Sequence, residues 1–297
     1  ETIKSLEKSK PQNEFTYLGS DDINHLRIVR EVSSGGFGRV LEVAKESPFA
    51  LKQMHISNHA TNVQIMRKFM NEYELLYKMN HPNIIRSFGF FIGDEKRPPS
   101  ILLEFCPHDL SSAITSGTNE QVAIWVYQIV EAMVYVHSCQ IIHRDLKPSN
   151  ILIGQDELIR VADFGISKLM TLEEQSSTMG AGTQKFMAPE LLNEEEYNEK
   201  VDVYAFGVLL YYIISRGEMP KITIIQMGNG KKAPIPNSFT ELAKQIIDLC
   251  WNRNPDERPS FARILEMLQG GDYAIVDLTP AEVKKVKTFV QNHKKLI

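Results

Sequence analysis

Short apolar runs separated by turn residues occupy the first third of the chain. Residues 25–32, 84–92 and 100–105 form such runs, and residues 93–99, which read Gly-Asp-Glu-Lys-Arg-Pro-Pro, separate the last two. Apolar runs of this length, bounded by Gly, Pro and Asp, favour the strands of a sheet. We therefore expect residues 84–92 and 100–105 to be paired strands.

The later apolar positions recur mainly at helical spacing. Residues 61–79 carry apolar side chains on one face, which predicts a helix. A longer helix is expected after Thr118, because residues 118–121 read Thr-Asn-Glu-Gln and have the form of a capping box. The longest apolar run, residues 203–214, has the length of a buried core helix and is too short to span a bilayer.

The pattern at the C-terminal end predicts one more helix. Residues 279–282, Thr-Pro-Ala-Glu, combine an N-cap, a proline at the first helical position and a capping glutamate. Val283, Val286 and Val290 then fall on one side, whereas lysines lie largely elsewhere. Two interpretations stay open: the helix packs on the rest of the protein, or it docks a partner or an anionic surface.

Composition narrows the classes of function. The 297 residues, 43% of them hydrophobic, suffice for one large or two small cores. A net charge of −4 gives no general attraction for nucleic acid. Cys106, Cys139 and Cys250 are far apart and odd in number, which argues against a disulfide framework or a zinc site. This cysteine content fits a reducing compartment, so we expect a cytoplasmic protein. We also expect a fragment, because the chain begins with Glu1 rather than Met.

The most informative motif is residues 143–150, His-Arg-Asp-Leu-Lys-Pro-Ser-Asn, which Asp163-Phe164-Gly165 follows. Together, the motif and Asp163 supply two carboxylates, a lysine and an amide. Phosphoryl transfer needs positioning and charge neutralisation more than covalent chemistry, and these side chains can provide both. With these residues at this spacing, the chain resembles the protein kinase superfamily.

The resemblance extends from about residue 25 to residue 270. It implies an α+β, two-lobed protein kinase fold with a small antiparallel-sheet lobe that carries one helix and a larger, mainly helical lobe. The expected organisation is an N-terminal extension, a kinase domain and a C-terminal extension with the amphipathic helix. Their expected bounds are 1–22, 23–271 (lobes 23–105 and 107–271) and 272–297.

The resemblance also implies a role for each polar residue of the motif. Asp145 would accept a hydrogen bond from the substrate hydroxyl and take its proton late, while Lys147 would neutralise charge on the phosphoryl group. Asn150 and Asp163 would hold Mg²⁺, with Mn²⁺ as the alternative.

The nucleotide site is expected around residues 33–40, which resemble the glycine-rich loop of kinases although Ser33 stands where the first glycine is usual. Lys52 would bind the α- and β-phosphates of ATP and pair with Glu72, with Glu74 as the fallback. The other nucleotide contacts that the resemblance implies are Gly35, Gly36, Gly38, Val40, Ala50, Leu103, Glu104, Cys106, Asp109 and Leu152.

Residues 182–190 resemble the end of a kinase activation segment. Thr183 matches the threonine that contacts the catalytic Asp and Lys in Ser/Thr kinases, and Lys147 also favours Ser/Thr over Tyr substrates. Arg144 implies pairing with a phosphorylated side chain of that segment. The predicted phosphorylation sites are Ser176, Ser177 and Thr178.

Three further expectations concern structure. Glu190 should be buried against Arg258, and Asp202 should hold the backbone of the catalytic loop. Ser87 stands where the family usually has a larger apolar side chain.

The function predicted is that of a Ser/Thr protein kinase that uses ATP and acts on protein hydroxyls, regulated through its activation segment. Residues 203–210, with Cys250-Trp251, look most like the tyrosine-kinase-like group of these enzymes. Two alternatives stay open: a dual-specificity kinase, and a pseudokinase that serves as a scaffold without turnover. Only Ser33 and Ser87 support the pseudokinase.

Overall fold

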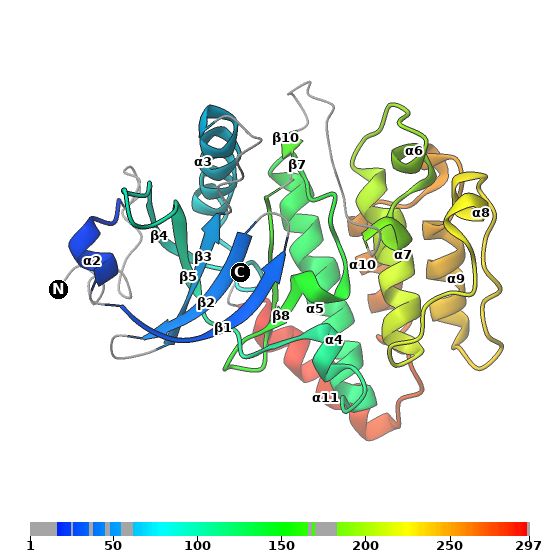
Figure 1. Cartoon of the computed structure of the whole chain (residues 1–297). Coiled ribbons are helices and arrows are strands. Elements are labelled where there is room, and N and C mark those ends of the chain that lie inside the picture. Colours follow the sequence, from blue (N-terminus) through cyan, green and yellow to red (C-terminus); the bar gives the residue numbers. More distant parts are fainter. Residues whose placement is uncertain are drawn as a thin grey trace. The chain divides into compact units, whose positions relative to one another are not determined.

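The computed structural model describes residues 17–24, 26–35, 38–44, 48–54, 62–165, 168–169 and 183–295. The chain divides into two units, each with its own set of contacts (Figure 1). The smaller unit comprises residues 1–80 and 85–106, and the larger comprises residues 81–84 and 107–297. Strands of an antiparallel sheet dominate the first and helices the second, which confirms the predicted fold class.

The smaller unit contains a five-stranded antiparallel sheet in the spatial order β1-β2-β3-β5-β4. Its strands are β1 (Arg27–Gly35), β2 (Gly38–Ala44), β3 (Pro48–Met54), β4 (Ser87–Phe91) and β5 (Ser100–Glu104). The predicted pairing of the last two runs is present, with Phe91 opposite Ser100.

One expected strand boundary is wrong. The run predicted over residues 84–92 begins only at Ser87, because Ile84 belongs to the larger unit and forms an isolated bridge with Val161 there. The Asn83 carbonyl accepts a hydrogen bond from the Val161 N–H at 2.8 Å. Ile84 is therefore buried without being part of the sheet.

The helix predicted over residues 61–79 is α3 (Asn62–Lys78). Its buried Phe69 and Tyr73 pack against Phe90 of β4, with ring centroids 6.1 and 4.6 Å apart. Leu18, from the expected N-terminal extension, is also fully buried, and its N–H donates to the Phe90 carbonyl at 2.7 Å. The short helix α2 (Ser20–Asn24) follows it. In the sequence, Tyr17 and Leu18 are a single apolar pair in a polar stretch, without helical or strand spacing, so they gave no sign of this packing.

The larger unit is built around two long helices, α5 (Asn119–Ser138) and α7 (Lys200–Ile214), whose residues are mostly buried. The predicted capping box begins α5: the Thr118 N–H donates to Gln121 Oε1 at 2.9 Å, and Thr118 Oγ1 accepts the Gln121 N–H at 3.2 Å. Further helices are α4 (Leu110–Ala113), α6 (Pro189–Leu192), α8 (Ile224–Gly228), α9 (Glu241–Cys250), α10 (Phe261–Gly270) and α11 (Pro280–His293).

Short strands of the larger unit position its loops. β6 (His108–Asp109), β8 (Ile151–Ile153) and β9 (Ile159–Val161) form a small antiparallel sheet. β7 (Ile141–Ile142) pairs with β10 (Lys168–Leu169). The single-turn 3₁₀ helices are η1 (Pro148–Asn150), η2 (Thr183–Phe186) and η3 (Pro255–Glu257).

The tail helix α11 runs beside α5 (Figure 1). Its predicted cap is present, since the Thr279 N–H donates to Glu282 Oε2 at 2.8 Å. Val286 and Val290 are 0% and 3% exposed, so the domain covers the apolar stripe. Of the two interpretations of this helix, packing on the domain is the one that the structure adopts.

His293, near the end of α11, lies in a buried polar cluster. Its Nε2 is 2.6 Å from Asn83 Oδ1, and because an amide oxygen can only accept, Nε2 carries the proton. Glu131 Oε2 lies 3.3 Å from the same nitrogen, and Tyr127 donates its hydroxyl to Glu131 Oε1. Burial lowers the pKa of His293 and raises the pKa of Glu131, so the cluster favours neutral side chains.

A second buried histidine lies two residues before Asn83. His81 Nδ1 accepts the Asn83 N–H at 3.1 Å, and its ring stacks on Tyr135 with centroids 5.0 Å apart. Burial, with a smaller contribution from His293, lowers the pKa of His81 to about 4. A hydrogen bond accepted by Nδ1 also requires the neutral ring.

We predict that mild acid destabilises the larger unit through His81. The unfolded chain takes up this proton near pH 6.5 and the folded chain only near pH 4. The stability from the neutral ring is therefore present above pH 6.5 and is lost as the pH falls towards 4, by about 1.4 kcal/mol per pH unit. Urea unfolding at pH 6.5 and pH 5 measures this loss.

His81→Gln should remove that part of the pH dependence. The matched control is His108→Gln, because His108 is exposed. It should keep the wild-type slope of unfolding free energy against pH. Equal slopes for wild type and His81→Gln would contradict the assignment.

Candidate active site

The loop between β7 and η1 is held by one buried carboxylate. The backbone N–H groups of His143 and Arg144 donate to the two oxygens of Asp202, each at 2.8 Å. Asp202 is 0% exposed and lies in the first turn of α7, as predicted. Burial alone would raise the pKa of Asp202, but the hydrogen bond to His137 and nearby histidines outweigh it, and the net pKa is lowered.

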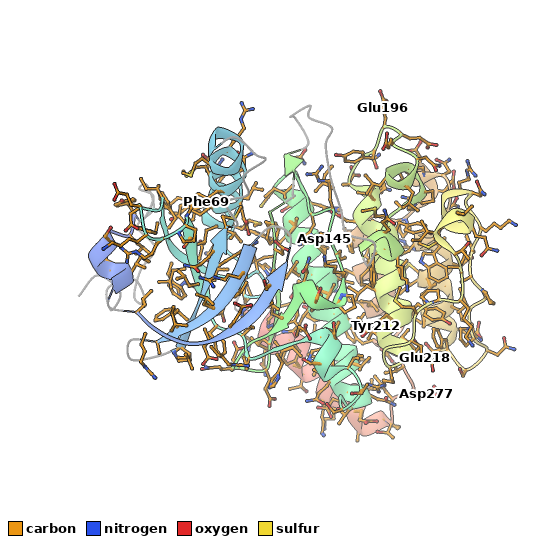
Figure 2. All side chains as sticks on the ribbon, in the orientation of Figure 1. Phe69, Asp145, Glu196, Tyr212, Glu218 and Asp277 are labelled. Atoms are coloured by element: carbon orange, nitrogen blue, oxygen red, sulfur yellow. The ribbon has the colours of Figure 1, made fainter. Side chains whose placement is uncertain are left out.

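Asp145 lies in this loop and is 8% exposed (Figure 2). Lys147 Nζ donates to its Oδ2 at 2.7 Å, and Asn150 Nδ2 donates to the same oxygen at 2.9 Å. Oδ1 is buried, and no described residue forms a hydrogen bond with it. A buried acceptor without a donor is costly, so this oxygen is suited to accept a hydrogen bond from a bound hydroxyl.

Asn150 and Asp163 are brought to neighbouring segments. The Ala162 N–H donates to the Asn150 carbonyl at 2.9 Å, and the His143 ring packs on Phe164 with centroids 4.8 Å apart. Arg144 and Asp163 both have a φ of 66°, a left-handed conformation that is uncommon outside glycine. Such backbone strain persists where the surrounding contacts fix it, as they do for this loop.

The donor set fits a nucleotide-bound cation. Nδ2 of Asn150 faces Asp145, so its Oδ1 is directed away from that carboxylate and is the atom left for a metal ion. Among the residues that the structure describes, no group of three or more His, Cys, Asp or Glu side chains could form a metal cage. Mg²⁺ commonly binds one or two protein oxygens and completes its shell with water and phosphate.

In the smaller unit, Lys52 of β3 pairs with Glu72 of α3. Lys52 Nζ lies 2.5 Å from Glu72 Oε1, and the two side chains are 14% and 3% exposed. The predicted pair is therefore present, and Glu74 is a half-buried residue elsewhere on α3. Because breaking a buried pair leaves an uncompensated charge, each partner fixes the other.

The glycine-rich loop is a hairpin between β1 and β2. Gly35 lies opposite Gly38, Ser33 opposite Val40, and Val40 opposite Lys52. A Cβ added to Gly38 would lie 2.0 Å from the Gln53 carbonyl oxygen, so strand packing alone requires glycine there. Gly36 lies outside the described residues.

The other predicted nucleotide contacts fall into two groups. On β3 and β5, Ala50 lies opposite Leu103, and Glu104 precedes the buried Cys106 by two residues. In the larger unit, Asp109 lies opposite Leu152. The Asp109 carboxylate also accepts the Ser112 N–H at 2.8 Å and caps α4, a local role that the sequence analysis did not foresee.

The end of the activation segment is anchored as expected. Arg258 forms a bidentate pair with Glu190, with Nη1–Oε1 and Nη2–Oε2 distances of 2.6 and 2.9 Å, and both side chains are buried. Thr183 begins η2, but its side chain lies outside the described part, as do Ser176, Ser177 and Thr178.

Two side chains of the larger unit, His137 and Tyr197, were not foreseen, and Ser87 of the smaller unit matches its expectation. Arg144 Nη1 donates to the Tyr197 hydroxyl at 2.9 Å, and His137 supports Asp202, as described above. A histidine at the end of a predicted helix was a weak signal for His137, and the sequence carried none for Tyr197. The Ser87 hydroxyl is buried and forms no hydrogen bond with the described residues, as expected for a serine in a position that is usually apolar.

Comparison with known proteins matches residues 26–268 to the protein kinase domain. The chain belongs to the protein kinase family. It is 31% identical over 317 residues to the serine/threonine/tyrosine-protein kinase HT1 of Arabidopsis thaliana. This match covers 99% of the present chain and 79% of HT1. It is 32% identical over 275 residues to the serine/threonine-protein kinase CTR1 of the same plant. Over 221 residues it is 39% identical to mitogen-activated protein kinase kinase kinase 12 of Rattus norvegicus.

These matches confirm the predicted class, a Ser/Thr protein kinase similar to the tyrosine-kinase-like group. The chain spans only 33% of CTR1 and 24% of the rat kinase, so their further regions have no counterpart in this match. Kinases of this family use ATP and a divalent cation and act on proteins. Among the described residues, no helix of this kinase domain is long and apolar enough to cross a membrane.

We predict that Asp202→Asn loosens the catalytic loop. The substitution keeps the size of the side chain but turns an amide NH₂ towards a backbone N–H, leaving two buried donors without an acceptor. The expected loss of unfolding free energy is about 2–4 kcal/mol. Urea unfolding measures it. Asp248→Asn is the matched control, because the Asp248 side chain is 61% exposed and pairs only with Lys232. An equal effect of the two substitutions would contradict the role of Asp202.

Proposed function

We propose that this kinase domain transfers the γ-phosphoryl group of ATP to Ser and Thr hydroxyls of proteins. The bond between the γ-phosphorus and the bridging oxygen breaks, the substrate oxygen forms the new bond, and ADP leaves. Asp145 orients the hydroxyl and takes its proton, and Lys147 neutralises the transferring group. Asn150 and Asp163 hold Mg²⁺, and Lys52, fixed by Glu72, binds the α- and β-phosphates.

The observation that carries this proposal is the arrangement around Asp145. One of its oxygens is held by Lys147 and Asn150, whereas the other is buried and accepts no hydrogen bond from the part of the chain that the structure describes. A carboxylate kept in this way can receive a hydroxyl proton without first giving up another hydrogen bond. The remaining nucleotide contacts belong to the same proposal: Ser33, Gly35, Gly36, Gly38, Val40, Ala50, Leu103, Glu104, Cys106, Asp109 and Leu152, with Thr183 assisting the catalytic residues.

Three finer points are also proposals. The kinase domain is taken to cover residues 23–271, with extensions on both sides, and Mn²⁺ is the alternative metal. A cytoplasmic location is supported by Cys106, Cys139 and Cys250, none of which forms a disulfide, because a reducing compartment keeps thiols from forming disulfides. A pseudokinase scaffold is the second candidate, favoured by the buried Ser87 hydroxyl, and transfer assays separate the two.

We predict that the wild-type chain transfers ³²P from Mg²⁺-ATP to a generic protein substrate. Asp145→Asn, Lys52→Met and Asp163→Asn should each lower the rate about a thousandfold, because each removes a charge at the reacting phosphates or hydroxyl. Ser33→Gly is the matched control at the nucleotide site, with an expected mild change. The substrate class is tested by determining whether the ³²P label is on Ser and Thr residues. Labelling that persists undiminished in Asp145→Asn would refute the mechanism, and ATP binding without transfer by wild type would establish the pseudokinase.

Regulation through Ser176, Ser177 and Thr178 is a separate proposal. Arg144 Nη1 now donates to Tyr197, and its guanidinium could exchange this neutral partner for a phosphate, which forms stronger charge-assisted bonds. We predict that mass spectrometry finds phosphate on these residues after incubation with ATP. Replacing all three by alanine should lower turnover about tenfold, and Arg144→Gln should have the same effect without adding to it. A triple-alanine variant of full activity would exclude the regulatory role.

A further inference from the structure

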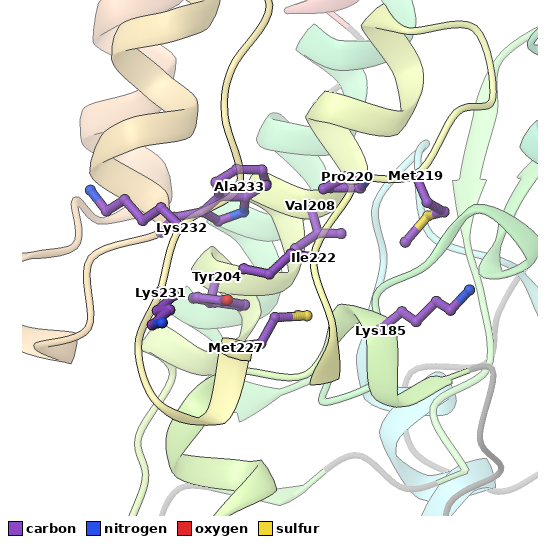
Figure 3. A pocket seen from close by; sticks show the side chains of 11 residues that line it. Lys185, Tyr204, Val208, Met219, Pro220, Ile222, Met227, Lys231, Lys232 and Ala233 are labelled. Atoms are coloured by element: carbon purple, nitrogen blue, oxygen red, sulfur yellow. The ribbon is translucent and has the colours of Figure 1, made fainter. Parts of the chain in front are cut away.

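A pocket of the larger unit is lined by residues of η2, of α7 and of the segment after α7, none of which is among the residues of the proposed reaction. We call Tyr204 and Val208 of α7, together with Trp251, the floor of the pocket, and Ile222 and Met227 its walls. Figure 3 labels these residues except Trp251. Tyr204 is 4% exposed, and the Arg258 guanidinium stacks on its ring at 5.1 Å. The floor is therefore a fixed apolar surface rather than a mobile one.

Three lysines surround these apolar side chains, and we call the whole site the lysine pocket. Lys185 lies on one side of the apolar group, and Lys231 and Lys232 lie on the other (Figure 3). Lys232 pairs with Asp248 at 2.7 Å. Lys185 and Lys231 are exposed, and no ion pair to either is found in the described part of the chain.

The positive charge of this site is local. Residues 219–233 contain no Asp or Glu but three lysines: the pocket residues Lys231 and Lys232, and Lys221. The whole chain, in contrast, has a net charge of −4. The same segment also presents Ile225 of α8, which is 78% exposed and precedes the pocket residue Met227 by two positions. Apolar side chains rimmed by unpaired ammonium groups complement a ligand that is itself apolar and acidic.

We propose that the lysine pocket docks an acidic segment of a partner protein that carries a large apolar side chain. The apolar side chain would pack on Val208 and Met227, and carboxylates on either side of it would pair with Lys185 and Lys231. Methionine at the wall suits such a role, because its flexible thioether adapts to different side chains. This interaction goes beyond phosphoryl transfer and does not require it.

The test is binding of a fluorescein-labelled peptide in which glutamates flank a single leucine, followed by fluorescence anisotropy without ATP. Wild-type protein should bind it saturably, and raised salt should weaken binding, because exposed charges are screened. Lys231→Glu should weaken binding at least about fivefold, since it replaces an attraction by a repulsion. Lys221→Glu is the matched control: Lys221 is exposed in the same segment but does not line the pocket, so the change should stay below about twofold.

Two further peptides separate the contribution of the apolar side chain from that of the carboxylates. Replacing the leucine by serine, or the glutamates by lysines, should each abolish saturable binding. The proposal is overturned if wild type does not bind the acidic peptide, if the serine peptide binds equally well, or if Lys221→Glu weakens binding as much as Lys231→Glu. Because no ATP is present, failure here leaves the proposed kinase activity untouched, and a chain without transfer activity could still bind the peptide.

Discussion

The buried carboxylate of Asp202 is the contact on which the catalytic loop depends. It accepts two consecutive backbone N–H groups, from His143 and Arg144, and so fixes the direction in which the chain enters the loop. Arg144 there has a left-handed backbone conformation, which the loop would not keep without the hydrogen bonds to Asp202. Asp145 then takes its place between Lys147 and Asn150. The position of the Asp145 carboxylate is thus set by a residue of a core helix.

Buried ion pairs repeat this logic elsewhere in the two units. Lys52 with Glu72 joins a strand to a helix, and Glu190 with Arg258 joins the end of the activation segment to the loop before α10. The desolvation of such charges costs about as much free energy as their attraction returns, so their value lies in specifying which side chains meet. Each pair holds a polar residue of the proposed reaction, or the segment that leads to it, in a defined place.

Features fixed by local chemistry could be predicted from the sequence. The capping boxes at Thr118 and Thr279 and the apolar run of α7 depend on neighbours within a few residues. Asp145, Lys147 and Asn150 could be expected to lie together because one short loop carries all three.

Contacts between distant segments could not be predicted. The apolar residue Ile84 matched a strand, but a bridge to Val161 determines its place. His293 and Asn83 are 210 positions apart, and neither side chain alone indicates a buried partner. Asp109 shows a third limit, because one carboxylate can cap a helix and still match a family motif. In each case tertiary packing decides between roles that the local sequence permits equally.

The packing of α11 has a consequence for how this chain can change in evolution. The match to the kinase family ends at residue 268, yet buried side chains continue to His293. Because His293 and Asn83 share one hydrogen bond inside the protein, the tail cannot diverge independently of the loop that carries Asn83. A substitution at either position removes this buried hydrogen bond, so the two positions, 210 residues apart, are constrained as a single site.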